Sequence, residues 1–454
     1  MQQTVRIMSR PADAITPQPV PATDATAGLR FRMVAAAYAI WLLGVWLVFY
    51  LVHGRDENAQ QLVVMGGAIP ALLQLFLLGV DWRGLVAPTK IWLALLFVIL
   101  LSYVVNAMDP RTAPTATNGT VIPPSWIPVV YTMNTAFITA IATLVAGSPD
   151  RRLLRAVASF YCVITAPYLL YVDLTGKMLW GRLAANDLEP NNWGLMGLTL
   201  CLAALARKLG PVAVASFAVG VYTILLASSR EHLVALVGVL LVLVVLRLRT
   251  LSRSRLYTAL VGSCVALGLA AVLLDPYILD ALRYFNHDIL LLDSPNRGVD
   301  SGFTGRTYIW SAAVDLWMKS PLLGVGFRQH EQFLGGLPAH NAYLAMLADT
   351  GVLGLIVYLV LQIGSLIASW RIEDERIRRF IMTSIVGYII IGFFDRRTIN
   401  SGNPYGLFFL MCCAFALADR SLRKASRLYQ LKLGASAAGS SDQSRPALAE
   451  HRAF

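Results

Sequence analysis

Apolar runs of about 20 residues recur along most of this 454-residue chain, and they restrict its fold more strongly than any other feature. A helix of that length crosses the hydrocarbon core of a bilayer, which is roughly 30 Å thick. The composition agrees, because 57% of the residues are hydrophobic and 14% are charged, whereas soluble domains contain about 25% charged residues. The sequence therefore predicts an all-α, polytopic integral membrane protein.

The apolar runs predict about twelve transmembrane helices, an even number that places both termini on one side. We expect these spans at about 33–52, 61–80, 91–108, 128–147, 153–173, 191–207, 211–228, 231–248, 257–275, 342–369, 378–395 and 404–418. The chain then divides into a disordered tail (1–28), the first nine helices (29–275), a long loop (276–341), the last three helices (342–418) and a second tail (419–454).

Basic residues are distributed unequally between the short loops of the two sides. The side that carries the tails is the richer one, with clusters at 151–155 and 247–255. Cytoplasmic loops of membrane proteins carry the excess of Lys and Arg, so both tails are predicted to be cytoplasmic and the loop 276–341 to lie on the outer face. This bias accounts for the net charge of +12, and nucleic acid is not expected as a partner.

The long outer loop contains a helical pattern. Thr304 can cap a helix that Pro321 ends. Between them, apolar residues recur at helical spacing, namely Tyr308, Ile309, Ala312, Ala313, Leu316 and Trp317. Long ordered loops are usually functional, and an amphipathic helix of this kind is expected to lie in the outer interface of the bilayer.

Three arginines are predicted to lie near the outer face, where cations are scarce: Arg182, Arg230 and Arg306. A guanidinium stays charged and grips phosphate oxygens with two donors, so several near one membrane surface suit a lipid pyrophosphate. Helix starts at Thr304 and near Ser229 would add backbone donors and a positive dipole end. These features predict an anion site, although a single Arg at a helix end more often contacts lipid headgroups.

A base near this anion site could take the proton of a hydroxyl nucleophile. His340 is the first candidate, because an imidazole with an unperturbed pKa of about 6.5 suits that task near neutral pH. Glu231 is the alternative. A histidine at such a place is as often an ordinary interface residue as a base.

The stretch from Thr304 to Gly354 resembles the signature region of the bacterial O-antigen ligase and O-antigen or exopolysaccharide polymerase superfamily. The matching residues are Gly305, Arg306, Trp310, Pro321, Gly324, Gly326, His340, Asn341, Gly351 and Gly354. Upstream, Ser229 with Arg230 and Arg182 with Pro190 and Asn191 look similar as well. The resemblance is specific over the first stretch and mostly topological elsewhere.

The resemblance implies an all-helical, C-type glycosyltransferase-like enzyme of the bacterial inner membrane that needs no metal or cofactor, with its active site on the periplasmic face. Its donor would be an oligosaccharide linked to undecaprenyl pyrophosphate, and its acceptor a lipid-linked repeat unit or lipid A core. Chain-length regulators or export proteins would be partners. Arg230, Arg306 and Arg182 would hold the pyrophosphate, and His340 would activate the acceptor hydroxyl. The glycan or the acceptor would be bound by Asn191 and Asn341.

The TGRTYIW and HNAYLAMLADTG segments are more similar to polymerases than to ligases. A polysaccharide transporter or flippase is the main alternative, but it would carry midplane polar groups and internal repeats. Asp349 lies inside the tenth predicted span, yet no two halves look alike. A scaffold of an export machine would not need Arg and His on one face. Roles remain open for Asp187, Glu189, Arg396 and Arg397.

Overall fold

The computed structural model describes most of the predicted membrane region. The described residues are 25–51, 65–108, 127–148, 150, 152–179, 182–184, 190–249, 258, 265, 306–398 and 406–422. Their elements are α1 (Ala25–Leu51), α3 (Ala68–Leu77), α4 (Trp82–Met108), α5 (Ile127–Ala146), α6 (Leu153–Thr175), β1 (Lys177–Leu179), β2 (Arg182–Ala184), α7 (Pro190–Leu205), α8 (Pro211–Leu226), α9 (Arg230–Leu248), α12 (Arg306–Lys319), α13 (His330–Phe333), α14 (Ala342–Ser369), α15 (Glu375–Gly392) and η4 (Arg396–Thr398). A further helix occupies 406–422.

Helices coincide with the predicted spans, except for 257–275, most of which lies outside the described residues. Among the described residues, 6 helices are long and apolar enough to cross a bilayer, and they are α1, α4, α5, α6, α9 and α14. The helices α3 and α8 are apolar but shorter. The structure therefore confirms a mostly helical, multi-pass membrane protein, while a total of about twelve spans stays a prediction.

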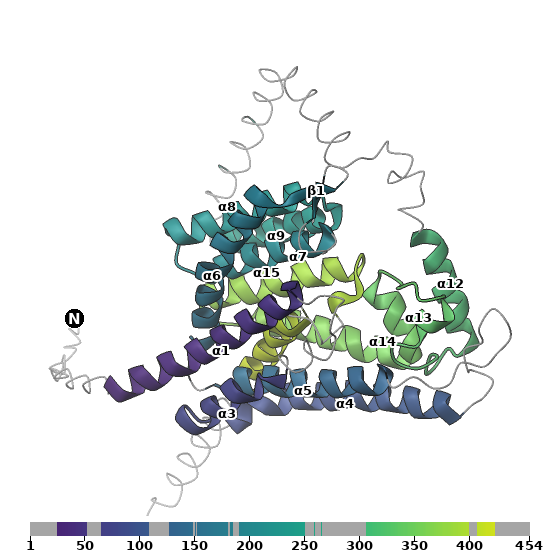
Figure 1. The fold of residues 1–454 in the computed structure, drawn as a ribbon. Helices are drawn as coiled ribbons and strands as arrows, with labels where there is room; N and C mark the ends of the chain where they lie inside the picture. The colour runs from purple at the N-terminus through teal and green to yellow at the C-terminus, as the bar shows by residue number, and fades with distance from the viewer. Residues whose placement is uncertain are drawn as a thin grey trace, which may run out of the picture.

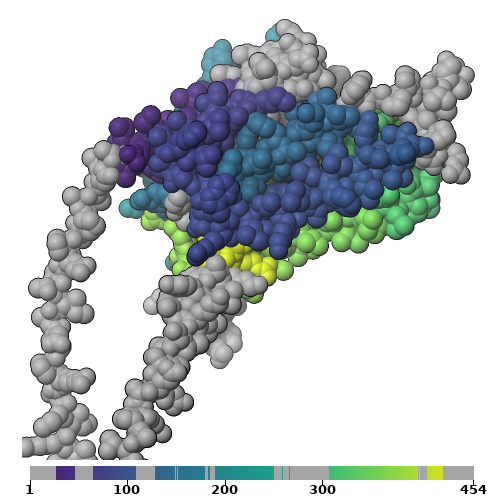
Figure 2. All heavy atoms as spheres, turned by 90° about the horizontal axis from the view of Figure 1, so that it is seen from below, coloured from purple at the N-terminus to yellow at the C-terminus, as the bar shows by residue number. Residues whose placement is uncertain are grey.

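The outward surfaces of these helices are apolar. Leu93 and Phe97 on α4 are 61% and 64% exposed, and Val237 and Leu241 on α9 are 56% and 60% exposed. Figure 2 shows a face of the molecule over which α4 extends. Apolar surfaces this extensive are unfavourable in water and are typical of contact with lipid tails.

The helices form two groups that α14 joins. Figure 1 shows α6, α7, α8, α9 and α15 gathered on one side and α3, α4 and α5 on the other, and α14 contacts both α4 and α15. Within the first group, α7 is buried at every position from Asn192 to Ala204. It meets α8 through two glycines, because a Cβ on Gly197 would lie 2.6 Å from the carbonyl oxygen of Gly220. This contact brings the two backbones close together.

One short hairpin departs from the predicted all-α fold. Strands β1 and β2 pair antiparallel, with Met178 opposite Leu183 and Leu179 opposite Arg182. Leu183 is fully buried, while Arg182 and Ala184 are half-buried. Each strand is only 3 residues long, and an alternation this short cannot be distinguished from a loop in the sequence. The hairpin places Arg182 beside α7 and α8.

The helix α14 is interrupted near its start. Gly351 has φ 64° and ψ −166°, which no residue inside a helix adopts. The carbonyl oxygens of Ala348 and Asp349 accept hydrogen bonds from the amides of Val325 (2.8 Å) and Gly326 (2.9 Å). The loop between α12 and α14 thus supplies partners for backbone groups at the interruption, which in a membrane must be satisfied by protein.

The predicted amphipathic helix corresponds to α12. Its inner face includes Ala313 and Leu316, which are buried against α14 and the loop before it. Tyr308 belongs to the predicted apolar face but is 76% exposed, so that face is buried only in part. The predicted cap Thr304 lies outside the described residues.

Candidate active site

The turn between α8 and α9 holds several candidate residues in a buried setting. Ser228 has a φ of 45°, and Ser229 is extended and directly precedes α9. Both are at most 7% exposed. The Oγ atom of Ser229 lies 2.6 Å from Nδ1 of the fully buried His232. Because α9 begins at Arg230, the free backbone amides and the positive end of its dipole face this turn.

Glu231 and Arg306 form an ion pair across 75 residues of sequence. Nη1 of Arg306 lies 3.1 Å from Oε2 of Glu231, and their side chains are 18% and 7% exposed. The pair joins the first residue of α12 to the first turn of α9. A guanidinium has five N–H donors, so an arginine paired in this way can still donate to phosphate oxygens. Two sequence candidates therefore share one place in the structure.

Arg182 is tied to the same turn by hydrogen bonds. Its Nε donates to the carbonyl oxygen of Ala227 (2.9 Å) and its Nη2 to Oδ1 of Asn191 (2.7 Å). The hydroxyl of Ser229 also donates to Oδ1 of Asn191, at 3.5 Å. The contacts of Arg182 and Asn191 connect β2, the start of α7 and the α8–α9 turn, and they fix the position of that turn.

Gly194 lets α7 approach this turn closely. A Cβ at Gly194 would lie 2.7 Å from Nδ1 of His232 and 2.9 Å from Cβ of Ser229. Both distances are shorter than a carbon contact allows, so only glycine fits between α7 and α9 here. The start of α9 therefore rests directly on α7.

His340 and Asn341 stand at the start of α14. Asn341 caps that helix, since its Oδ1 accepts from the amides of Tyr343 (2.9 Å) and Leu344 (3.0 Å). Its Nδ2 donates to the carbonyl oxygen of Phe393 at the end of α15 (3.0 Å). The Asn341 side chain is thus engaged in holding α14 to α15, and its predicted contact with a glycan or acceptor stays a prediction.

His340 is held from the α12 side as well. Nε1 of Trp310 on α12 donates to the carbonyl oxygen of Ala339 at 2.9 Å. His340 itself is half-buried and has a φ of 49°. A non-glycine residue in this region costs about 1–3 kcal/mol, and such strain is found mainly at functional sites. The same helix α12 therefore carries Arg306 at its start and positions the residue before His340.

A second charged cluster, which we call the 328 cluster, was not predicted. It consists of Arg328, Glu331 and Arg396 with Tyr131. Nη1 of Arg328 lies 3.0 Å from Oε1 of Glu331, and Arg396 forms an ion pair with the same carboxylate oxygen. The guanidinium of Arg328 lies 4.3 Å from the ring centroid of Tyr131. The polar FRQHEQF segment in an otherwise apolar chain was the available sign.

Asp349, which the sequence placed alone in a span, has a partner. Its Oδ1 lies 2.7 Å from Nδ1 of His330 and accepts the His330 amide at 3.0 Å. Both side chains are fully buried. The carbonyl oxygen of Asp349 also accepts from the hydroxyl of Ser102 on α4 at 2.7 Å. This pair fastens the loop before α14 to the interruption of that helix.

The remaining candidates from the sequence are described only in part. Asp187 and Glu189 lie outside the described residues. Arg396 belongs to the 328 cluster, whereas the side chain of Arg397 is not described. Arg230 is half-buried at the first position of α9. The candidate site that emerges is the α8–α9 turn with Arg182, Asn191, Arg230, Glu231 and Arg306, joined through α12 to His340.

Comparisons with known proteins agree with the sequence resemblance. Residues 215–359 match the family model described as O-antigen ligase. The chain is also 25% identical over 150 residues to the exopolysaccharide production protein ExoQ of Rhizobium meliloti (strain 1021). That alignment covers 29% of this chain and 34% of the relative. The matched range 215–359 contains Arg230, Glu231, Arg306, His340 and Asn341, whereas Arg182 and Asn191 precede it.

Proposed function

Because residues 215–359 carry the match to the O-antigen ligase family, we propose that this chain is a glycosyltransferase of the bacterial inner membrane. It moves a glycan from undecaprenyl pyrophosphate to an acceptor hydroxyl at the periplasmic face. A polymerase of exopolysaccharide or O-antigen repeat units is favoured over a ligase, since the similar protein ExoQ is an exopolysaccharide production protein. The ligase, with lipid A core as acceptor, is the alternative outcome of the assay below.

The ion pair between Arg306 and Glu231, 3.1 Å long, is the observation that carries this proposal. It holds the starts of α9 and α12 together, which supports a site where Arg306, the first residue of α9 (Arg230) and the positive end of the α9 dipole act on one anion. A diphosphate needs such a concentration of fixed positive charge when its bond to a sugar breaks. Donors that are already oriented stabilise the developing charge without reorganisation.

The proposed reaction is a displacement at the anomeric carbon. The acceptor oxygen forms a bond to that carbon while the bond from the carbon to the pyrophosphate oxygen breaks, and its electron pair leaves with undecaprenyl pyrophosphate. Arg230 and Arg306 bind the phosphate oxygens, and the acceptor proton passes to the imidazole of His340. Glu231 keeps the guanidinium of Arg306 in place. Arg182 and Asn191 support the turn from which α9 begins.

Turnover of purified protein with lipid-linked repeat units, with and without lipid A core, tests the proposal. A ladder of lengthening products identifies a polymerase, and a shifted core band identifies a ligase. Repeat units that are neither lengthened nor transferred would overturn the glycosyltransferase assignment.

The two proposed pyrophosphate ligands have a matched control. Arg306→Ala and Arg230→Ala should each remove product formation, because a donor to the leaving group is lost. Arg306→Ala also leaves the buried Glu231 without its ion-pair partner, so thermal unfolding of each variant is measured beside its activity. Lys319→Ala removes a cation from the other end of α12, where the side chain is exposed, and should leave activity intact. Normal product lengths from either arginine variant would exclude that residue from the mechanism.

Two observations favour a transporter or flippase as the second candidate. The interrupted helix α14 and the fully buried His330–Asp349 pair are features that transporters use at their binding sites. A transporter would move lipid-linked repeat units across proteoliposome membranes without extending them. Movement without any new glycosidic bond would favour this candidate, whereas product formation by the purified protein would exclude it as the sole function.

A further inference from the structure

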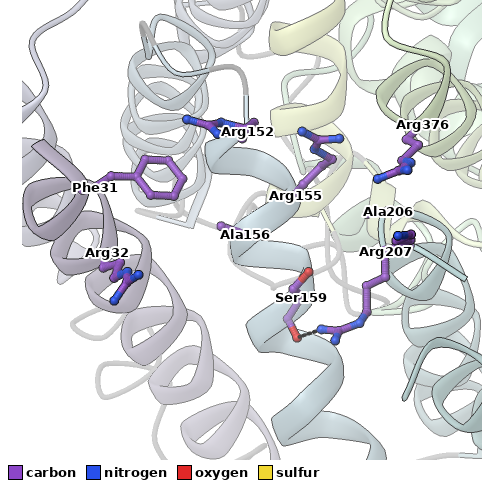
Figure 3. Close-up of a pocket in the computed structure, with 11 residues that line it drawn as sticks. Phe31, Arg32, Arg152, Arg155, Ala156, Ser159, Ala206, Arg207 and Arg376 are labelled. Atoms are coloured by element: carbon purple, nitrogen blue, oxygen red, sulfur yellow. Dashed lines mark hydrogen bonds between the residues drawn. The ribbon is translucent and has the colours of Figure 1, made fainter. Parts of the chain in front are cut away.

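A hollow lined by cations lies at the opposite ends of the helices from the candidate site. Its volume is about 440 Å³, and it is lined by residues of α1, α6, the α7–α8 turn and α15. We call it the basic hollow. Its six cationic side chains are those of Arg32, Arg152, Arg155, Arg207, Lys208 and Arg376. Figure 3 shows Arg155 on α6 and Arg152 directly before that helix, with Phe31 and Arg32 on one side and Arg207 and Arg376 on the other.

The position of the basic hollow follows from two helices. α7 begins at Pro190, next to the site residue Asn191, and ends at Leu205, two residues before Arg207; its 16 residues span about 24 Å. α15 begins beside Arg376 and ends at the Phe393 carbonyl that accepts from Asn341. The basic hollow therefore lies on the opposite face from the candidate site and cannot share its ligand.

Two carboxylates offset only part of this positive charge. Asp150 lies 2.9 Å from Nη2 of Arg152, and Asp374 lies 3.3 Å from Nη1 of Arg155. Burial raises the pKa of Asp150, but the hydrogen bonds from Arg152 and the charges of Arg152 and Arg155 outweigh it and lower that pKa below its ordinary value. Asp150 is therefore ionised near neutral pH. Six cations still face two carboxylates at the hollow.

Several cations are directed by the protein itself. Nη1 of Arg207 donates to the carbonyl oxygen of Ser159 at 3.1 Å, which fixes its guanidinium beside α6. Arg32 and Lys208 are exposed, and among the residues that the structure describes they form no ion pair. Clustered cations repel one another, so such an arrangement is stabilised when an anion binds between them.

The surroundings of the hollow are those of a membrane interface. Phe31, Ala156 and Ala206 line it together with the cations. Further along the α1–α6 seam, Leu42, Leu43 and Ile164 border a small apolar crevice of about 10 Å³. A phosphate in the basic hollow would leave an attached acyl chain free to lie along this apolar seam. Basic pockets between transmembrane helices bind the headgroups of anionic lipids in this manner.

We propose that the basic hollow binds the phosphate headgroup of an anionic phospholipid, on the membrane face opposite the candidate site. The convergence of cations from four separate elements around one hollow distinguishes it from the scattered basic residues of ordinary cytoplasmic loops. The inference does not depend on the glycosyltransferase proposal, because it involves neither the residues nor the activity of the candidate site.

Thermal unfolding of the purified full-length protein tests the lipid site. Phosphatidylglycerol or phosphatidylcholine is added in mixed micelles, and Tm is followed as a function of lipid concentration. Phosphatidylglycerol should raise Tm and phosphatidylcholine should not, since a ligand that binds only the folded state stabilises it. Equal effects of the two lipids would overturn the proposal.

A variant pair localises the effect. Arg32→Gln combined with Lys208→Gln should keep the wild-type Tm in detergent and need about tenfold more phosphatidylglycerol for the half-maximal shift, as two surface charges are lost. The control combines Arg83→Gln with Arg247→Gln. These exposed cations lie at the start of α4 and at the end of α9, on the same membrane face as the hollow but outside it. The control should respond as the wild type does, and equal responses of both double variants would refute the site.

Inorganic phosphate separates the two sources of a phosphate group. Phosphate alone, without lipid, should not reproduce the shift in Tm, because the apolar seam then stays unoccupied. A full shift with inorganic phosphate would reject the lipid and assign the hollow to a soluble phosphate compound.

Discussion

Glu231 is a buried, negatively charged side chain, and two features of the structure stabilise its charge. Its side chain is 7% exposed and lies 3.1 Å from Arg306, and it belongs to the first turn of α9, where the helix dipole favours an anion. A buried charge without such partners is strongly destabilising. Glu231 therefore suits the task of holding Arg306 better than that of a base exchanging protons with an acceptor.

Replacing Glu231 distinguishes these two roles. Glu231→Gln keeps the shape and an oxygen acceptor for Arg306 but removes the charge, so we expect a KM for the lipid-linked donor raised about tenfold or more with kcat less affected. Loss of kcat at unchanged KM would instead identify Glu231 as the base. Steady-state kinetics with varied donor concentration make the distinction.

His340 has a different expected signature. His340→Ala should abolish turnover while donor binding is retained, because the arginines that hold the pyrophosphate are unchanged. Leu337→Ala, in the same loop and 50% exposed, serves as the control. The shift in Tm caused by the lipid-linked donor measures whether donor binding is retained. Product formation on a gel measures whether turnover is lost. Wild-type turnover in the variant would remove His340 from the chemistry.

Single residues could be predicted where a charge stands out in an apolar chain. Arg230, Arg306 and His340 were predicted in this way, and their roles stay predictions. The structure pairs Arg306 with Glu231 on α9 and ties Ala339, the residue before His340, to α12. The polar FRQHEQF segment marked the place of the 328 cluster, but the pairing of its residues could not be predicted, because it depends on the path of the loop. Arg328 has a φ of 65°, and nothing in the sequence indicates this turn.

At the scale of elements, the interruption of α14 anchors the loop between α12 and α14, which leads to His340. A Cβ on Gly351 would lie 2.3 Å from the backbone of Leu322, so the loop and the helix are in direct backbone contact. The sequence predicted an uninterrupted span at 342–369, since an apolar run containing glycine reads as helical. The interruption depends on hydrogen bonds from residues before the helix, which periodicity cannot reveal.

Two glycines of α14 provide a matched pair for testing this contact. Gly351→Ala combines a positive φ with a clash and should lower stability by about 1–3 kcal/mol and reduce activity. Gly364→Ala on the same helix meets nothing within 4 Å and should be neutral or stabilising by up to about 1 kcal/mol. Thermal unfolding and turnover of both variants measure the difference. A stable and active Gly351→Ala would show that the interruption is dispensable.

At the scale of the whole molecule, α7 and α15 separate the face that holds the candidate site from the face that holds the basic hollow. The apolar runs and their periodicity were sufficient to locate the described helices other than the short α13 and η4. The way these helices pack was not predictable, because contacts such as that of Gly197 with Gly220 join helices whose relative positions the sequence does not specify.

Cysteine labelling tests the predicted orientation of these two faces. Leu337→Cys, before α14, should react with a membrane-impermeant maleimide added to the periplasm. Glu373→Cys, exposed between α14 and α15, should react only after the cytoplasmic side is opened. The native cysteines Cys162, Cys201, Cys412 and Cys413 are buried, and a cysteine-free background also removes Cys264. The reverse pattern of labelling would invert the predicted topology.

The loop before α14 meets the first turns of that helix at two places. Gly326 donates to the carbonyl of Asp349, and the loop returns at the cap residue Asn341, about 12 Å away along the helix. Both ends of the segment 327–341 are thus attached to the same short part of α14. Arg328 and His340 therefore share one support, and a substitution that shifts the first turns of α14 should disturb both residues together.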